Sequence, residues 1–262
     1  MRTLARAVGS KDIGGEPLPT VFRTFDVNKI VIRRAEVSMI AGTPGAGKST
    51  LALAVALRSK VPTLYISADT NAHTMAMRLL SMISGQPQST AEQMLIESVE
   101  ESRKTINDNS GHIFWSFDSA PTLADLDMEV SAFEELWGCP PTLIVIDNLI
   151  DISNDSGEEF AAMRSTIKEL KYLARDTNAA VLILHHTKES YPGNPCQPRS
   201  ALQGMVAQLP ALICTVGTNA PGYIAIAPVK NRYGKADPTG DTSFWLQFNP
   251  EVMEVSDIPE RI

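Results

Sequence analysis

The chain has 262 residues, of which 44% are hydrophobic and 20% charged, which is enough apolar material for the core of one large domain. A net charge of -7 and a pI near 5.2 exclude a protein that coats duplex nucleic acid through an overall basic surface. An apolar leader and a run of about eighteen apolar residues are both missing, so we expect a cytoplasmic protein that makes no membrane contact. Cys139, Cys196 and Cys214 have no C-x-x-C spacing, which indicates neither a disulfide framework nor a zinc site.

Residues 1–19 mix Arg, Lys, Gly and Pro without periodicity. This composition is typical of a flexible N-terminal arm, and an arm that packs on a neighbouring subunit is the alternative. Residues 20–262 contain neither a repeat nor a low-complexity segment, and we expect them to form a single domain.

Residues 35–57 contain the most informative motif of the chain. The apolar residues 37–41 suit a buried strand, residues 42–49 (GTPGAGKS) fit the phosphate-binding pattern G-x-x-x-x-G-K-[ST], and residues 50–57 are rich in helix-forming Ala and Leu. A strand, a glycine-rich loop and a helix in this order are the context in which the pattern binds a nucleotide.

The motif predicts binding of ATP and Mg²⁺. Glycines let backbone N–H groups surround the phosphates, Lys48 reaches the β- and γ-phosphates, and the Ser49 hydroxyl ligates the metal. The predicted nucleotide-binding residues of this loop are Thr43, Pro44, Gly45, Ala46, Gly47, Lys48, Ser49 and Thr50.

The rest of the chain alternates predicted strands and helices. Apolar and β-branched runs predict strands over residues 62–67, 112–117, 142–146, 180–184, 209–216, 223–229 and 243–248. Helical spacing predicts helices after the first, second and third of these strands, with a break at residues 85–87 and a capping box at Ser89 and Glu92. The alternation indicates an α/β protein with a mostly parallel central sheet, extended by antiparallel C-terminal strands.

Ligands of such sheets gather at the carboxyl ends of the strands, where Lys48, Asp69, Asp147 and His186 all fall. Asp147 ends a strongly apolar strand, as a Walker B aspartate does, and is predicted to hold Mg²⁺ opposite Ser49.

Hydrolysis also needs a carboxylate that orients or deprotonates the attacking water. Asn148 follows Asp147, so the paired Asp-Glu of many ATPases is absent. Asp69 is the predicted substitute, and a helix N-cap is its alternative role.

His185 and His186 follow a buried strand, where side chains alternate between the two faces. One of them, which we expect to be His186, would hydrogen-bond the γ-phosphate and report its loss to the next loop. The alternative is that both histidines face solvent.

Lys230 and Arg232 lie two residues apart at a strand end, with no carboxylate nearby in the sequence that calls for an ion pair. They are predicted to form an arginine finger and its lysine partner, inserted into the next subunit's nucleotide site, and a solvated basic turn is the alternative. Tyr233 is a candidate to stack on the adenine.

Six segments resemble RecA-like ATPases in content and order: GTPGAGKST, LYISADT, LIVIDN, LILHHTKE, RSALQG and KNRYGKADPTG. Within that group residues 21–250 are most similar to DnaB-type hexameric replicative helicases, particularly the compact RepA type. The resemblance implies a RecA-type core that assembles into a hexameric ring or filament with ATP between subunits. It also implies that Lys230 and Arg232 act in trans and that His186 couples the γ-phosphate to a DNA-contacting loop.

By the same resemblance, residues 148–157 and 187–200 would be the central-channel loops that contact single-stranded DNA, with Lys188 and Arg199 as their basic residues. Two departures stand out. The family usually has Glu at the position of Asp69, and the separate N-terminal domain of many replicative helicases is missing.

Three functions follow from this reading. The first is an oligomeric, DNA-dependent ATPase that acts as a helicase-like motor in replication or recombination. The second is a single-strand DNA-binding or recombination protein that ATP switches on, and the third is a RecA-like signalling ATPase that needs no nucleic acid.

Overall fold

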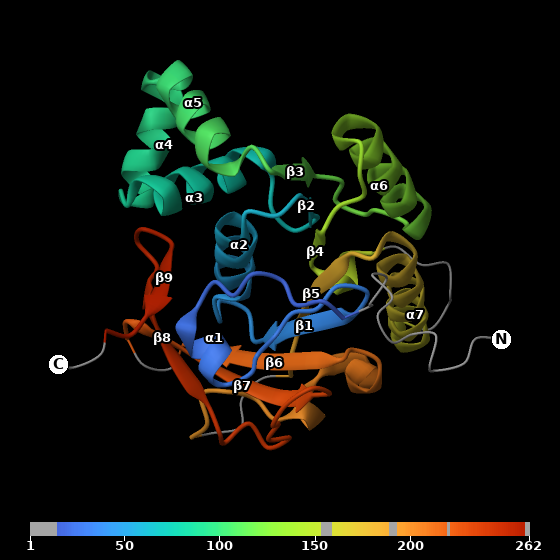
Figure 1. Ribbon diagram of the computed structural model, residues 1–262. Helices are drawn as coiled ribbons and strands as arrows, with labels where there is room; N and C mark the ends of the chain where they lie inside the picture. Colours follow the sequence, from blue (N-terminus) through green and yellow to red (C-terminus); the bar gives the residue numbers. More distant parts are fainter. Residues whose placement is uncertain (1–14, 153–158, 189–192, 219–220, 260–262) are drawn as a thin grey trace.

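The computed structural model describes residues 15–152, 159–188, 193–218 and 221–259. Its centre is a sheet in the order β3-β2-β4-β5-β1-β6-β7-β8-β9 (Figure 1). The strands are β1 Val37–Gly42, β2 Thr63–Ser67, β3 Ile113–Ser116, β4 Leu143–Asp147, β5 Ala180–His186, β6 Leu212–Gly217, β7 Tyr223–Asn231, β8 Phe244–Asn249 and β9 Glu254–Asp257.

The helices follow the strands as the alternating pattern predicts. They are α1 Arg23–Val27, α2 Lys48–Ser59, α3 Ala72–Ser84, α4 Gln88–Glu97, α5 Val99–Ser110, α6 Leu123–Trp137 and α7 Glu159–Thr177, together with the short 3-10 turns η2 Leu149–Asp151, η3 Arg199–Ala201 and η4 Gln203–Gln208.

The pairing confirms the predicted fold class. Strands β1 to β6 pair in parallel, and β7, β8 and β9 extend the sheet in antiparallel fashion. The antiparallel part starts one strand later than expected, because β6 lies parallel to β1.

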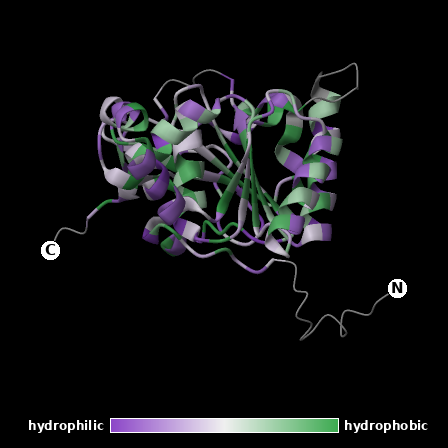
Figure 2. Ribbon diagram, turned by 90° about the horizontal axis from the view of Figure 1, so that it is seen from above, coloured by the Kyte–Doolittle hydropathy of each residue, from purple (hydrophilic) through white to green (hydrophobic). Residues whose placement is uncertain are grey.

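Helices cover both faces of the sheet, and Figure 2 shows the apolar strands between two helical layers. Alternation along β1 divides its side chains between the layers: Ile40 packs with α1 and α2, whereas Met39 and Ala41 pack with α6 and α7. Each central strand is therefore buried on both faces, which explains its uninterrupted apolar sequence.

The sequence analysis missed α5 and β9 and misplaced one helix start. Helix α4 begins at Gln88 without a side-chain cap, so the capping box expected at Ser89 and Glu92 is wrong. A capping box does form on α6, where the Thr122 and Asp125 side chains bond each other's backbone. Helices α3, α4 and α5 pack together as a group at one end of the molecule (Figure 1).

The expected arm at residues 1–19 divides into two parts. Residues 1–14 lie outside the described residues, whereas residues 15–19 pack on the body of the protein and do not extend freely. Leu18 is buried and its N–H donates to the Ile32 carbonyl, and Arg33 donates to the Gly15 carbonyl at 2.6 Å. Within the described part of the chain, none of the helices combines the length and apolar character that crossing a membrane requires.

Candidate nucleotide-binding site

The strand order brings four segments of the chain to one edge of the sheet. Strands β2, β4, β5 and β1 are consecutive neighbours and parallel, so their carboxyl ends meet. A cavity of about 330 Å³ lies there, lined by the loop after β1 and by residues that follow the other three strands. Its polar lining includes Lys48, Ser49, Asp69, Asp147 and His186.

The loop after β1 has the backbone of a phosphate cradle. Gly45 and Gly47 have φ of +76° and +82°, a region that favours glycine, and Gly47 caps the N-terminus of α2. Gly42 is required for a different reason, since a Cβ there would lie 2.7 Å from the Val216 carbonyl oxygen. All of the predicted loop residues except Thr43 line the cavity: Pro44, Gly45, Ala46, Gly47, Lys48, Ser49 and Thr50.

Lys48 is folded back onto its own loop. Its ammonium donates to the carbonyl oxygens of Gly42 at 3.1 Å and Thr43 at 3.0 Å. Burial lowers the pKa of Lys48, and the negative charges of Asp147 and Asp69 oppose that shift. A cation held between backbone oxygens can transfer to the oxygens of a bound phosphate with little movement of the chain.

Asp147 is 4% exposed and lies against Ser49, as the metal-binding prediction requires. Its carboxylate accepts hydrogen bonds from the Ser49 hydroxyl and, at 3.2 Å, from the Tyr65 hydroxyl. Burial raises the pKa of Asp147, and these two donors oppose the rise. The Ser49 and Asp147 oxygens are close enough to share one cation, and hard oxygen donors of this kind fit Mg²⁺.

Asp69 lies exposed at the rim of the cavity. Its alternative role as a helix cap is wrong, because Asn71 is the N-cap of α3 and accepts from the Thr74 N–H at 2.9 Å. Arg78 of α3 also lines the cavity, and the sequence analysis did not single it out.

The two histidines of β5 point to opposite faces. His186 lines the cavity, where its Nε2 lies 3.2 Å from the Asn148 amide nitrogen, whereas His185 is fully buried with its Nε2 3.0 Å from the Gln203 carbonyl oxygen. Burial and the nearby Lys48 ammonium lower the pKa of His186, so that its ring is neutral at pH 7. The alternative with both rings in solvent is therefore wrong.

The apolar wall of the cavity comes from the C-terminal strands. Phe248, Pro250 and Met253 line it, and Gln88 fastens this turn through its side-chain amide, which donates to the Pro250 carbonyl at 2.9 Å. No local pattern marks these residues, since they reach the phosphate loop only through the pairing of β6, β7 and β8.

Lys230, Arg232 and Tyr233 lie elsewhere. Asn231 pairs with Leu212, which pairs with Ser38 at the start of β1, so this turn is at the edge of the sheet opposite the phosphate loop. The six residues of β1, at about 3.3 Å per residue, place the two edges roughly 20 Å apart. Tyr233 is therefore unable to stack on a base held in its own chain's cavity.

The turn also has the carboxylate partner that the sequence analysis did not expect. Arg232 forms an ion pair with Glu36 at 2.9 Å, so the prediction of an unpaired basic pair is wrong for Arg232. Lys230 donates to the carbonyl oxygens of Ala207 at 3.0 Å and Gln208 at 2.7 Å.

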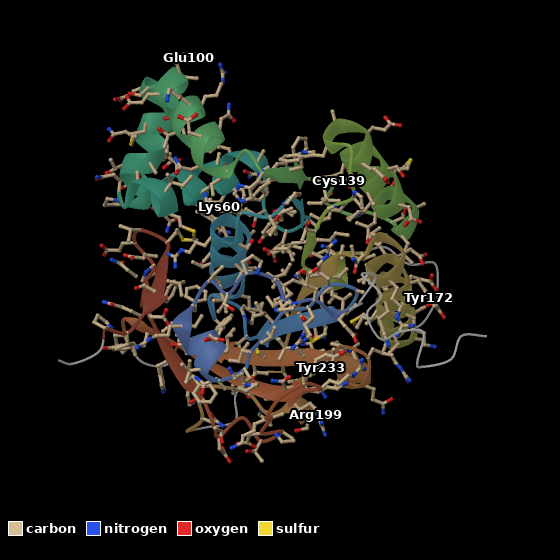
Figure 3. All side chains as sticks on the ribbon, in the orientation of Figure 1. Lys60, Glu100, Cys139, Tyr172, Arg199 and Tyr233 are labelled. Carbon is tan, nitrogen blue, oxygen red and sulfur yellow. The ribbon has the colours of Figure 1, made fainter. Side chains whose placement is uncertain are left out.

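A second cavity, of about 1050 Å³, lies beside Lys230 and Arg199. Figure 3 shows Arg199 and Tyr233 at the same side of the molecule, near β6 and β7. Of the two predicted DNA-contacting loops, residues 153–158 and 189–192 lie outside the described residues, while Lys188 is exposed and Arg199 opens the turn η3.

Comparison with known proteins identifies the family. The AAA domain family AAA_25 matches residues 26–190. The chain belongs to this family. The gene 65 protein of Mycobacterium phage L5 is 32% identical over 270 residues, covering 98% of this chain and 99% of the phage protein. The replicative DNA helicase DnaB of Leifsonia xyli is 26% identical over 189 residues, covering 66% of this chain and 40% of that protein.

Solved structures share the fold at low sequence identity. An ATPase domain solved on its own superimposes with a TM-score of 0.79 at 14% identity, over 98% of this chain and 96% of that one. A DnaB-like replicative helicase gives 0.78 at 14% identity, over 98% of this chain and 67% of the other. The chain is thus a RecA/DnaB-like ATPase domain of helicase or recombinase type, whose family membership indicates use of a nucleotide and ATP hydrolysis.

Proposed function

We propose that this protein is an oligomeric, DNA-dependent ATPase that acts as a helicase-like motor in DNA replication or recombination. The observation that carries the proposal is the separation of Lys230 and Arg232 from the phosphate loop of the same chain, which sits at the opposite edge of the sheet. A nucleotide site that needs both halves is complete only between two copies, with the second copy supplying the basic turn.

Within one copy the residues of the cavity have distinct proposed roles. Lys48 and the backbone N–H groups of the loop bind the triphosphate, and Asp69 at the rim orients the attacking water. His186, neutral and bonded to Asn148, accepts or donates a hydrogen bond at the γ-phosphate and passes its loss to the loop after β5.

Ser49 and Asp147 would hold Mg²⁺, which when bound supplies positive charge to the transferring phosphoryl group. Phe248 and its neighbours on the C-terminal turn would contact the base. Lys230, Arg232 and the cavity beside Arg199 would face the nucleotide of the adjacent copy. Single-stranded DNA would contact the loops that carry Lys188 and Arg199 in a hexameric ring or a filament.

The test is ATP turnover with and without single-stranded DNA, measured together with the mass of the assembled protein. We expect several-fold stimulation by DNA, an assembly of several copies, and loss of turnover in Lys48→Ala. Tight ATP-dependent DNA binding with little turnover would favour the DNA-binding switch instead. Turnover and assembly that are both indifferent to DNA would overturn the proposal in favour of the signalling ATPase.

A further inference from the structure

The turn after β7 is tied to the residues that precede β1. One carboxylate oxygen of Glu36, Oε1, accepts from Nη1 of Arg232 at 2.9 Å and from the Tyr233 hydroxyl at 2.8 Å. The side chain of Glu36 is only 13% exposed, whereas that of Arg232 is 43% exposed. An ion pair with one shielded partner and a second donor on the same oxygen is better defined than a pair between two solvated side chains.

Two more contacts hold the same turn. The Arg33 guanidinium lies over the Tyr233 ring, 4.7 Å from its centre, and Asn231 donates to the Lys29 carbonyl at 2.9 Å. All the partners therefore come from residues 29–36, the segment that leads directly into β1.

The geometry leaves Arg232 able to bind something else. A guanidinium has five N–H donors in a planar fork, and Glu36 engages Nη1. A partner on one side limits the rotamers of a long side chain, so less entropy is lost when the other donors bind a phosphate.

We propose that Glu36 is a positioning residue that holds Arg232, and with it Tyr233, in the orientation needed to enter the nucleotide site of a neighbouring copy. This inference rests on the proposed function. Glu36 immediately precedes β1, and β1 ends at the phosphate loop, so one rigid strand fixes the spacing between a copy's own nucleotide site and the turn it offers to its neighbour.

The first test is steady-state ATP turnover of Glu36→Ala. Because small displacements of a positioned group cost up to about 100-fold, we expect kcat to fall by about 10- to 100-fold, with KM for ATP changed by less than about twofold. Glu36→Gln keeps a hydrogen-bond acceptor but loses the charge, so its drop should be smaller, and it serves as the test variant if Glu36→Ala does not fold. Glu16→Ala is the matched control, since Glu16 pairs at 3.7 Å with Arg34 in the same region but does not touch the turn.

The second test distinguishes positioning of the turn from damage to the same copy's own cavity. Glu36→Ala copies retain an intact phosphate loop, and Lys48→Ala copies retain an intact turn. In a 1:1 mixture of the two, random head-to-tail assembly makes about one quarter of the interfaces complete, so turnover should recover to about that fraction of the wild-type value. The mixture of Arg232→Ala with Lys48→Ala should recover equally.

The outcomes separate the two proposals. If Arg232→Ala keeps full turnover, the proposed function fails. If Arg232→Ala is inactive and recovers in the mixture while Glu36→Ala behaves like wild type, or loses turnover without recovering, only the role of Glu36 is refuted.

Discussion

Removing the Tyr65 hydroxyl tests the metal-binding half of the cavity without changing its shape. Tyr65 is fully buried on β2, its ring packs on Trp115 with 4.8 Å between centres, and its hydroxyl donates to Asp147 at 3.2 Å. Tyr65→Phe keeps the ring contact and deletes only this hydrogen bond. A hydrogen bond to a charged group contributes about 1.5–3 kcal/mol, so the free energy of unfolding should fall by about that amount.

The same change should weaken the hold on Mg²⁺. The Tyr65 hydroxyl opposes the burial effect that raises the pKa of Asp147, so its loss raises that pKa further and leaves the carboxylate less well oriented toward Ser49. Loss of a residue that orients a ligand typically costs about 10- to 100-fold in metal affinity or activity. We therefore expect half-maximal ATP turnover at a Mg²⁺ concentration about ten-fold or more higher than for the wild type.

The assays are urea denaturation and turnover across a Mg²⁺ titration. Tyr172→Phe is the control, because Tyr172 is exposed on α7 and remote from Asp147. If Tyr65→Phe shows wild-type stability and wild-type Mg²⁺ dependence, the assignment of Asp147 as a supported metal ligand is refuted.

Three further changes probe the remaining walls of the site. Asp69→Asn should leave ATP binding intact and lower turnover at least about 100-fold, because an amide does not take the proton of the attacking water; unchanged turnover removes Asp69 from the reaction. Phe248→Ala should raise KM for ATP up to about ten-fold through lost stacking while the affinity for inorganic triphosphate stays the same, and equal losses for both ligands contradict a base-binding role. Burial lowers the pKa of His185 below its usual value, so the folded protein binds fewer protons than the unfolded chain, and stability that is complete above about pH 6.5 is lost as the pH falls, by at most about 1.4 kcal/mol per pH unit. His185→Gln should flatten that slope in urea denaturation between about pH 7.5 and pH 5.5, and an identical slope speaks against this linkage.

The motifs that the sequence analysis recognised are those in which neighbouring residues act together. The glycines of the phosphate loop, the run of β4 before Asp147 and the alternation that separates His185 from His186 are all properties of adjacent positions. Helix α5 was missed because it is strongly polar and buries only Ser102 and Ser110, which leaves almost no apolar period to detect.

The sequence by itself determined the kind of fold and the phosphate-binding end of the site, because strand burial, loop glycines and helix propensity are encoded locally. Only the tertiary structure decided which distant side chains meet. Tyr65 reaches Asp147 because β2 pairs with β4, and Phe248 reaches the phosphate loop because three strands are added beyond β1. Glu36 meets Arg232 across 196 positions of the chain because β6 and β7 return the chain to the start of β1, and strand pairing over such distances has no signature in a single sequence.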